Sequence, residues 1–210
     1  KIRNLPLEIP LWLESHGGPR LVVTPREPVV RYGGSVQLNC SLACVGGTVQ
    51  WKGLDTNLGS ITSFPTHSIL HVSSAVVAME GTKVCQGTCH GQHYQHAVNL
   101  KVYALPDTLQ LETDPHALEP GQPARLRCSA RQAYPLMGLV LTWYRGDQVL
   151  EQPDFDVTDP DEELSDIVST LGAGLFPLAA SPCPGRLCLW GGGGGGCRAA
   201  WTEGAVTPWG

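Results

Sequence analysis

The sequence predicts an all-β chain built from two tandem sandwiches. Cys40, Trp51 and Cys85 have the spacing of two cysteines that join facing sheets and a tryptophan that packs on their bridge. The order recurs in the second half, where Cys128 is followed by Trp143. A chain of 210 residues also has room for two domains of about 100 residues each. These three observations together predict immunoglobulin-like domains.

Apolar runs and two-residue alternation predict the strands of the first domain, which we expect to span residues 19–103. Val36, Leu38 and Cys40 alternate inward, and Val49 and Trp51 form the next inward pair. The predicted strands lie at 21–23, 28–30, 34–40, 49–51, 69–72, 81–85 and 93–103. The last of these alternates cleanly and closes the domain, whereas residues 1–18 fit no element and stay unassigned.

The second domain should follow a short junction at 104–107 and span residues 104–178, with strands near 109–111, 126–128 and 140–144. The strand pattern fails after Leu171, so we expect this sandwich to be incomplete. Residues 179–210 contain six consecutive glycines, which cannot repay the entropy of ordering their backbone. The sequence therefore predicts a disordered Gly-rich C-terminal tail, in which Cys197 is unpaired. We expect Cys128 to pair with a cysteine in a later strand that is missing from this sequence, and whether Cys183 or Cys188 takes that place stays open.

An acidic stretch without any basic residue lies between positions 147 and 166. Like charges at this density repel one another, so we expect a ribbon or loop that stands off the surface. Its negative field favours a positively charged partner. The ribbon residues that we single out are Asp154, Asp156, Asp159, Asp161, Glu162 and Glu163.

Charge and composition exclude several classes of function. The net charge is −5 and no cluster of Lys or Arg occurs, which argues against nucleic acid as a partner. No nucleophile is accompanied by a matching base, so we expect neither an enzyme nor a small-molecule substrate. Eight cysteines indicate an oxidising, extracellular compartment. We find no leader peptide and no apolar run of about 18 residues, so a signal peptide and a membrane anchor are expected outside this sequence.

The first four cysteines form two pairs with the same internal spacing, which predicts disulfides Cys40–Cys85 and Cys44–Cys89. A rival interpretation is a zinc-binding protein that uses a cluster at 85–96, namely Cys85, Cys89, His90, His93 and His96. Alternation in a strand places His93 and His96 on opposite faces, and the cysteines already have matched partners. We therefore expect no metal site in this chain. Asn39 begins an Asn-Cys-Ser sequence that fits the pattern for N-glycosylation.

A short loop after the Trp51 strand is the best candidate for a binding site. Its sequence is GLDTNLG, at positions 53–59, with a single carboxylate between two glycines that let the backbone project. An isolated Asp in a loop is usually an ordinary turn residue. A carboxylate held out on a rigid scaffold can also bind a divalent cation on a partner protein, because such ions prefer oxygen ligands.

Three segments resemble a family of endothelial immunoglobulin-type adhesion molecules, the addressins and the intercellular and vascular adhesion molecules. These segments are QWKGLDTNLG at 50–59, GTKVC at 81–85 and VYALPD at 102–107. The resemblance implies an adhesion ligand that supports lymphocyte homing to mucosal tissue, with integrin alpha-4 beta-7 on lymphocytes as its partner. A different integrin, or an inactive adhesion module, is the alternative.

The resemblance also implies roles for particular residues. Asp55 would donate a carboxylate oxygen to a divalent cation, Mg or Mn, that belongs to the integrin and not to this chain. Leu54 would fill an apolar crevice on the integrin, and Gly53 and Thr56 would complete the binding loop. The acidic ribbon would make auxiliary contacts and help to choose between integrins.

Overall fold

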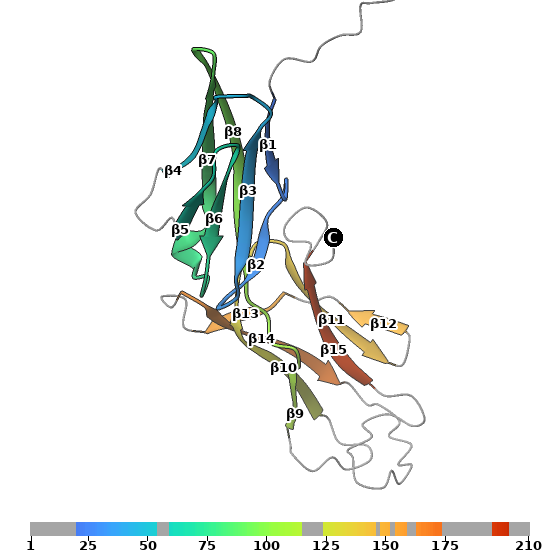
Figure 1. Ribbon diagram of the computed structural model, residues 1–210. Helices are drawn as coiled ribbons and strands as arrows, with labels where there is room; N and C mark the ends of the chain where they lie inside the picture. The colour runs from blue at the N-terminus through green and yellow to red at the C-terminus, as the bar shows by residue number, and fades with distance from the viewer. Residues whose placement is uncertain are drawn as a thin grey trace, which may run out of the picture. The chain divides into compact units, whose positions relative to one another are not determined.

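The computed structural model describes residues 20–53, 59–114, 124–145, 148–151, 154–158, 163–173 and 195–201. Within these ranges the regular structure is β-strand, apart from one turn of 3-10 helix, η1 (Val77–Met79). No helix in the described part of the chain is long and apolar enough to cross a membrane. The all-β fold that the sequence predicts is confirmed (Figure 1).

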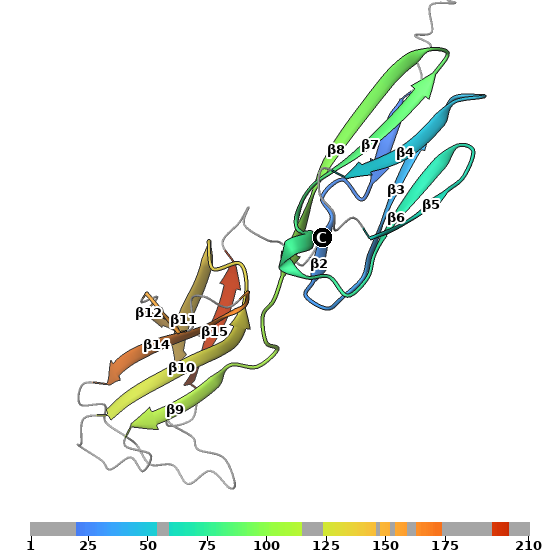
Figure 2. The ribbon, with the colours of Figure 1, turned by 90° about the vertical axis from the view of Figure 1, so that its left-hand side faces the viewer.

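The first sandwich consists of two four-stranded sheets. One has the order β1-β3-β6-β5, with strands Leu21–Thr24, Val36–Leu42, His67–Val72 and Ser60–Ser63. The other has the order β2-β8-β7-β4, with strands Val29–Arg31, Gln92–Tyr103, Gly81–Cys89 and Thr48–Gly53. Figure 2 shows β7 and β8 as a long hairpin with β4 beside β7. β8 ends at Tyr103, the residue at which we expected the first domain to close.

Two-residue alternation builds the core of this sandwich. Along β3, Leu38, Cys40 and Leu42 are buried, while the residues between them lie partly in solvent. Along β8, Val98, Leu100 and Val102 are buried in the same way. Each buried side chain removes apolar surface from water, which is the main force that holds two sheets together. The residues between the buried positions point to the outer face of each sheet, where polar side chains can contact water.

The second sandwich also has two sheets. The first has the order β13-β14-β10-β9, with strands Asp156–Thr158, Ser165–Ala173, Ala124–Ala133 and Gln110–Asp114. The second has the order β12-β11-β15, with strands Gln148–Glu151, Leu139–Arg145 and Gly195–Trp201. Leu126, Cys128, Trp143 and Leu171 are buried together at its centre.

β15 differs from expectation, because it lies in the segment for which we predicted disorder. It pairs antiparallel with β11 along its whole length, from Leu139 opposite Trp201 to Arg145 opposite Gly195. Cys197 forms a disulfide with Cys128, so the expectation that Cys197 is unpaired was wrong. Local composition disfavours order at these glycines, but the ladder to β11 and the disulfide hold the strand through contacts distant in sequence.

Two short strands, β12 and β13, lie within the acidic stretch, for which we expected a ribbon or loop. β12 pairs with β11, and β13 pairs with β14 so that Thr158 lies opposite Asp166. Asp166 accepts a hydrogen bond of 2.8 Å from the backbone N–H of Gln132. Gln132 has a φ of 57° at an irregularity in the β10–β14 register, and this bond satisfies its amide there. At least one carboxylate of the stretch therefore has a structural role.

Candidate functional site

The predicted binding loop connects the edge strands of the two sheets of the first sandwich. β4 ends at Gly53 on one edge and β5 begins at Ser60 on the other. Gly59, at the second end of the loop, has a φ of 85°, a backbone conformation that glycine adopts without strain. Leu54, Asp55 and Thr56 lie outside the described residues.

The strand that leads into this loop is firmly held. Trp51 is buried with 5% of its surface exposed, and its indole N–H donates a 2.9 Å hydrogen bond to the carbonyl of Ser68 in the opposite sheet. β4 pairs with β7 from Thr48 opposite Thr88 to Gly53 opposite Lys83. Lys83 is itself buried, with 2% exposure. The first end of the loop is therefore fixed up to its last strand residue.

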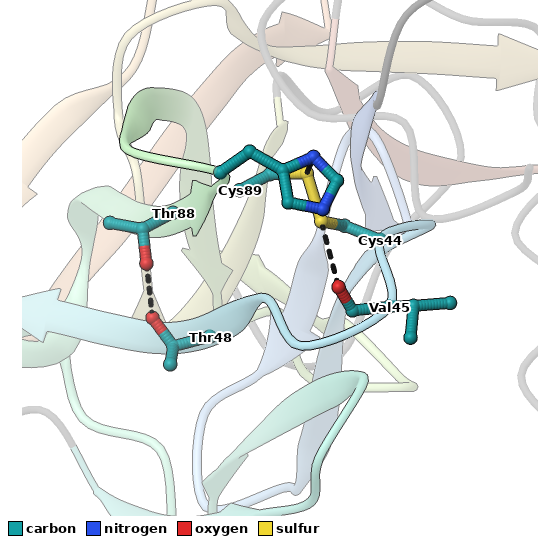
Figure 3. The surroundings of a disulfide bond; sticks show 6 residues. Cys44, Val45, Thr48, Thr88 and Cys89 are labelled. Atoms are coloured by element: carbon teal, nitrogen blue, oxygen red, sulfur yellow. Dashed lines mark hydrogen bonds between the residues drawn. A yellow bond between two sulfur atoms is a disulfide. The ribbon is translucent and has the colours of Figure 1, made fainter.

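Two disulfides cross this sandwich. Cys40 is joined to Cys85 and Cys44 to Cys89, with Cα–Cα distances of 6.4 Å and 6.0 Å. Both bridges end on β7, and Cys85 lies directly opposite Trp51 in the ladder. Figure 3 shows the Cys44–Cys89 bridge and the nearby hydroxyl bond between Thr48 and Thr88. On the chain-entropy model, closing a loop of this size stabilises the fold by about 4 kcal/mol.

The two cysteines of the cluster considered for zinc are not free thiols in the structure. The sulfurs of Cys85 and Cys89 are in disulfides, so neither is a thiolate ligand. Potential ligand atoms of Cys44, Cys89 and His90 lie within 4.8 Å of one another, but two of the three are the bonded sulfurs. His93 is exposed on β8, whereas His96 is half-buried, as expected for positions of opposite parity.

Only part of the acidic ribbon lies in the described chain. Asp154 and Asp156 are exposed, with Asp156 at the start of β13. Glu163 is exposed just before β14. Asp159, Asp161 and Glu162 lie outside the described residues. Asp154 and Asp156 are thus accessible to a partner, whereas the two carboxylate oxygens of Glu163 accept hydrogen bonds from the hydroxyl of Tyr32 and the backbone N–H of Val77.

Asn39 lies on β3 opposite Thr24 of β1, at a partly exposed position between two buried residues. Its side chain therefore belongs to the outer face of the β1-β3-β6-β5 sheet. Its Oδ1 atom is buried and has no hydrogen-bond partner among the described residues.

Sequence reasoning missed one surface feature of the first sandwich. Polar residues of β4, β7 and β8 line a groove of about 400 Å³ on the β2-β8-β7-β4 sheet. Alternation indicates which residues of one strand face outward, as with Gln50 between the buried residues Val49 and Trp51. It does not tell which strands lie side by side, so the groove could not be assembled from the sequence.

Comparison with known proteins relates the chain to a group of adhesion molecules. Residues 17–108 match the family described as intercellular adhesion molecule (ICAM), N-terminal domain. Mucosal addressin cell adhesion molecule 1 of Rattus norvegicus is 37% identical over 167 residues, which cover 77% of this chain and 41% of the rat protein. Vascular cell adhesion protein 1 of Homo sapiens is 25% identical over 130 residues, covering 60% of this chain and 18% of the human protein.

Among solved structures, bovine butyrophilin shares the fold. Its TM-score is 0.58 at 12% sequence identity, and the match covers 73% of this chain and 85% of the butyrophilin chain. The chain spans about two fifths of the length of the rat addressin that it matches. The sequence matches and the disulfide-linked β-sandwiches agree: the chain is related in sequence to the mucosal addressin, vascular and intercellular cell adhesion molecules, and its residues 17–108 match the N-terminal domain of the intercellular ones.

Proposed function

We propose that the chain is the integrin-binding part of a cell-surface adhesion ligand and acts outside the cell, without enzymatic activity. Integrin alpha-4 beta-7 on lymphocytes is the partner, and homing to mucosal tissue is the process served. The observation that carries the proposal is the 37% identity to the rat mucosal addressin over 167 residues, together with the match of residues 17–108 to the N-terminal domain of intercellular adhesion molecules.

Asp55 is the central contact in this proposal. Its carboxylate coordinates a Mg or Mn ion on the integrin, while Leu54 fills an apolar crevice and Gly53 and Thr56 shape the loop. The rigid base at Trp51 and the two disulfides support this role, because a loop whose ends are held loses less entropy on binding. Asn39 carries an N-linked glycan, on the sheet face away from β4.

Replacing Asp55 tests the proposal directly. We expect Asp55→Ala to weaken cation-dependent adhesion by about 30-fold or more, because losing one partner of a desolvated charged contact costs about 2 to 5 kcal/mol. The measurement is adhesion of lymphocytes bearing alpha-4 beta-7 to the immobilised chain in Mn²⁺, Mg²⁺ or chelator. Asp55→Asn serves as the near-isosteric variant and should lose as much, since it removes the charge alone.

The matched control is Asp114→Asn, which removes an exposed carboxylate at the end of β9, outside the acidic ribbon. It should change adhesion by less than about threefold, because solvent screens an exposed charge. Equal adhesion by wild type and Asp55→Ala, with the disulfides intact in both, would exclude Asp55 as the contact. If the chain binds a different integrin in a purified panel, Asp55 remains the proposed contact, but alpha-4 beta-7 is not the partner.

A further inference from the structure

The β2-β8-β7-β4 sheet carries a groove that no step of the proposed integrin contact uses. It has a volume of about 400 Å³ and crosses three neighbouring strands, β4, β7 and β8. Its floor includes the backbone of Gly87, whose missing side chain would meet Leu42 and Leu21 in the core. The volume falls within the range of about 300 to 1,000 Å³ that is typical of sites for small ligands.

Strand alternation explains why the groove is polar. Val49, Trp51 and Cys85 point into the core, so their neighbours along β4 and β7 line the outer face. Gln50 lies directly opposite Gln86 in the ladder, and Thr48 opposite Thr88. The two threonine hydroxyls bond to each other, which fixes the distance between β4 and β7 at this end of the groove (Figure 3).

The side chains that line the groove suit an anionic ligand. None of the described residues that line it carries a carboxylate, although the chain has 19 acidic and 14 basic residues. Lys52 and His93, both exposed, are the basic side chains in its lining. Lys52 makes no ion pair with any described residue. A negative group on a ligand would thus find an uncompensated cation and no opposing carboxylate.

Three side-chain amides line the groove without a partner among the described residues. Gln50, Gln86 and Gln95 line it, and no hydrogen bond ties any of their side chains to another described residue. A side-chain amide both donates and accepts hydrogen bonds, as do the hydroxyls of a sugar. Gln95 and His93 share one face of β8, whereas Tyr94 between them has the parity of the buried residues of that strand. This combination suits a ligand with several hydroxyls around a compact ring.

We propose that this groove binds an anionic saccharide, a sugar ring that carries a carboxylate or a sulfate. Lys52 pairs with the anionic group, and the amides of Gln50 and Gln86 bond to neighbouring ring hydroxyls. An acidic peptide is disfavoured, because the groove lies on the face of the sheet, whereas a peptide that adds a strand pairs along a sheet edge.

The test uses the whole chain and three small probes, 3′-sialyllactose, 3-O-sulfated lactose and neutral lactose. Titration calorimetry or ligand-observed NMR should give a dissociation constant of about 1 mM or tighter for at least one charged probe. Lactose should bind about tenfold more weakly or not at all. Comparing the two charged probes tells whether the carboxylate or the sulfate is preferred.

Variants locate the site within the sheet. Lys52→Gln should lower the affinity for the charged probe about tenfold, because it removes a charge-assisted hydrogen bond. Lys52→Arg keeps the charge and should retain binding. Gln86→Ala should lower the affinity for the charged probe, and the chain should still bind charged probes more tightly than lactose. The matched control is Gln37→Ala, which removes an exposed glutamine from β3 in the other sheet and should change nothing. Asp55→Ala should also bind the probe normally, which separates this proposal from the integrin contact.

Failures of three kinds would overturn the proposal: no binding, binding without the predicted selectivity or site, and binding of a different ligand. The first is no binding of either charged probe by a chain whose disulfides are intact. The second is equal affinity for charged probes and lactose, or unchanged affinity in both Lys52→Gln and Gln86→Ala. The third is binding of a hexaglutamate peptide in the groove without any binding of sugars, which would assign the surface to an acidic peptide.

Discussion

Two tryptophans occupy equivalent places in the two sandwiches but satisfy their indole N–H groups differently. Trp51 donates to the backbone carbonyl of Ser68, whereas Trp143 donates a 3.1 Å bond to the hydroxyl of Ser169. Both serines are buried. The hydroxyl of Ser68 has no hydrogen-bond partner among the described residues. The serine hydroxyl therefore satisfies the indole in the second domain, whereas in the first domain the backbone carbonyl of the serine does so and its hydroxyl does not.

Replacing each serine by alanine tests this difference. Ser169→Ala should destabilise the second sandwich by about 1 to 3 kcal/mol, because it leaves the buried indole N–H of Trp143 unsatisfied. Ser68→Ala should be nearly neutral or stabilising, since it removes a buried hydroxyl that has no partner and keeps the carbonyl that Trp51 uses. Chemical denaturation of both variants measures the two effects. A larger loss for Ser68→Ala than for Ser169→Ala would contradict the assignment.

At the scale of elements, β15 shows how a strand can form from a segment of poor local propensity. It begins in a run of glycines, which lose more backbone entropy on ordering than other residues. Its order depends on the ladder to β11 and on the disulfide from Cys197 to Cys128. Cys197 also lies opposite Trp143, so this strand completes the cysteine and tryptophan arrangement of the second sandwich.

Removing this disulfide should release β15. We expect the double variant Cys128→Ala, Cys197→Ala to lose about 4 kcal/mol of stability on the chain-entropy model. Hydrogen exchange at residues 195–201 should then become faster, while exchange at β3 and β7 of the first sandwich stays unchanged. Unaltered protection of 195–201 in the double variant would mean that the ladder to β11 suffices without the disulfide.

At the scale of the whole chain, charge is unevenly distributed. Nine of the 19 acidic residues lie between positions 147 and 166, whereas no described residue that lines the groove of the first sandwich is acidic. Fields of this kind steer encounters with charged partners and are screened by salt. In the proposed adhesion function, the acidic ribbon should therefore affect the rate of association more than the strength of the final contact.

Neutralising the ribbon measures this contribution. A variant with all six ribbon residues changed to the corresponding amides should associate with the integrin several-fold more slowly at low salt, with little change in dissociation rate. The difference should shrink in about 0.5 M NaCl, where the screening length is only a few ångströms. Surface plasmon resonance at two salt concentrations gives both rates. An equal loss at both concentrations would indicate a direct contact instead of steering.

The sequence by itself determined the fold class and the framework of the first domain. Alternating apolar residues, the Cys40, Trp51 and Cys85 spacing and the end of the long strand at Tyr103 are local patterns, and the structure contains each of them. The binding loop at Asp55 was found through resemblance to a family, because one carboxylate between glycines has no specific signal of its own. Its residues 54–58 lie outside the described chain.

Only the tertiary structure decided which distant segments meet. It paired Cys197 with Cys128 and placed a glycine-rich segment in a sheet, although local propensity predicted disorder there. It also brought polar residues of β4, β7 and β8 into one groove. The physical reason is the same in each case: strand pairing and disulfides depend on contacts between residues far apart in the chain, and the energy of those contacts overrides local preference.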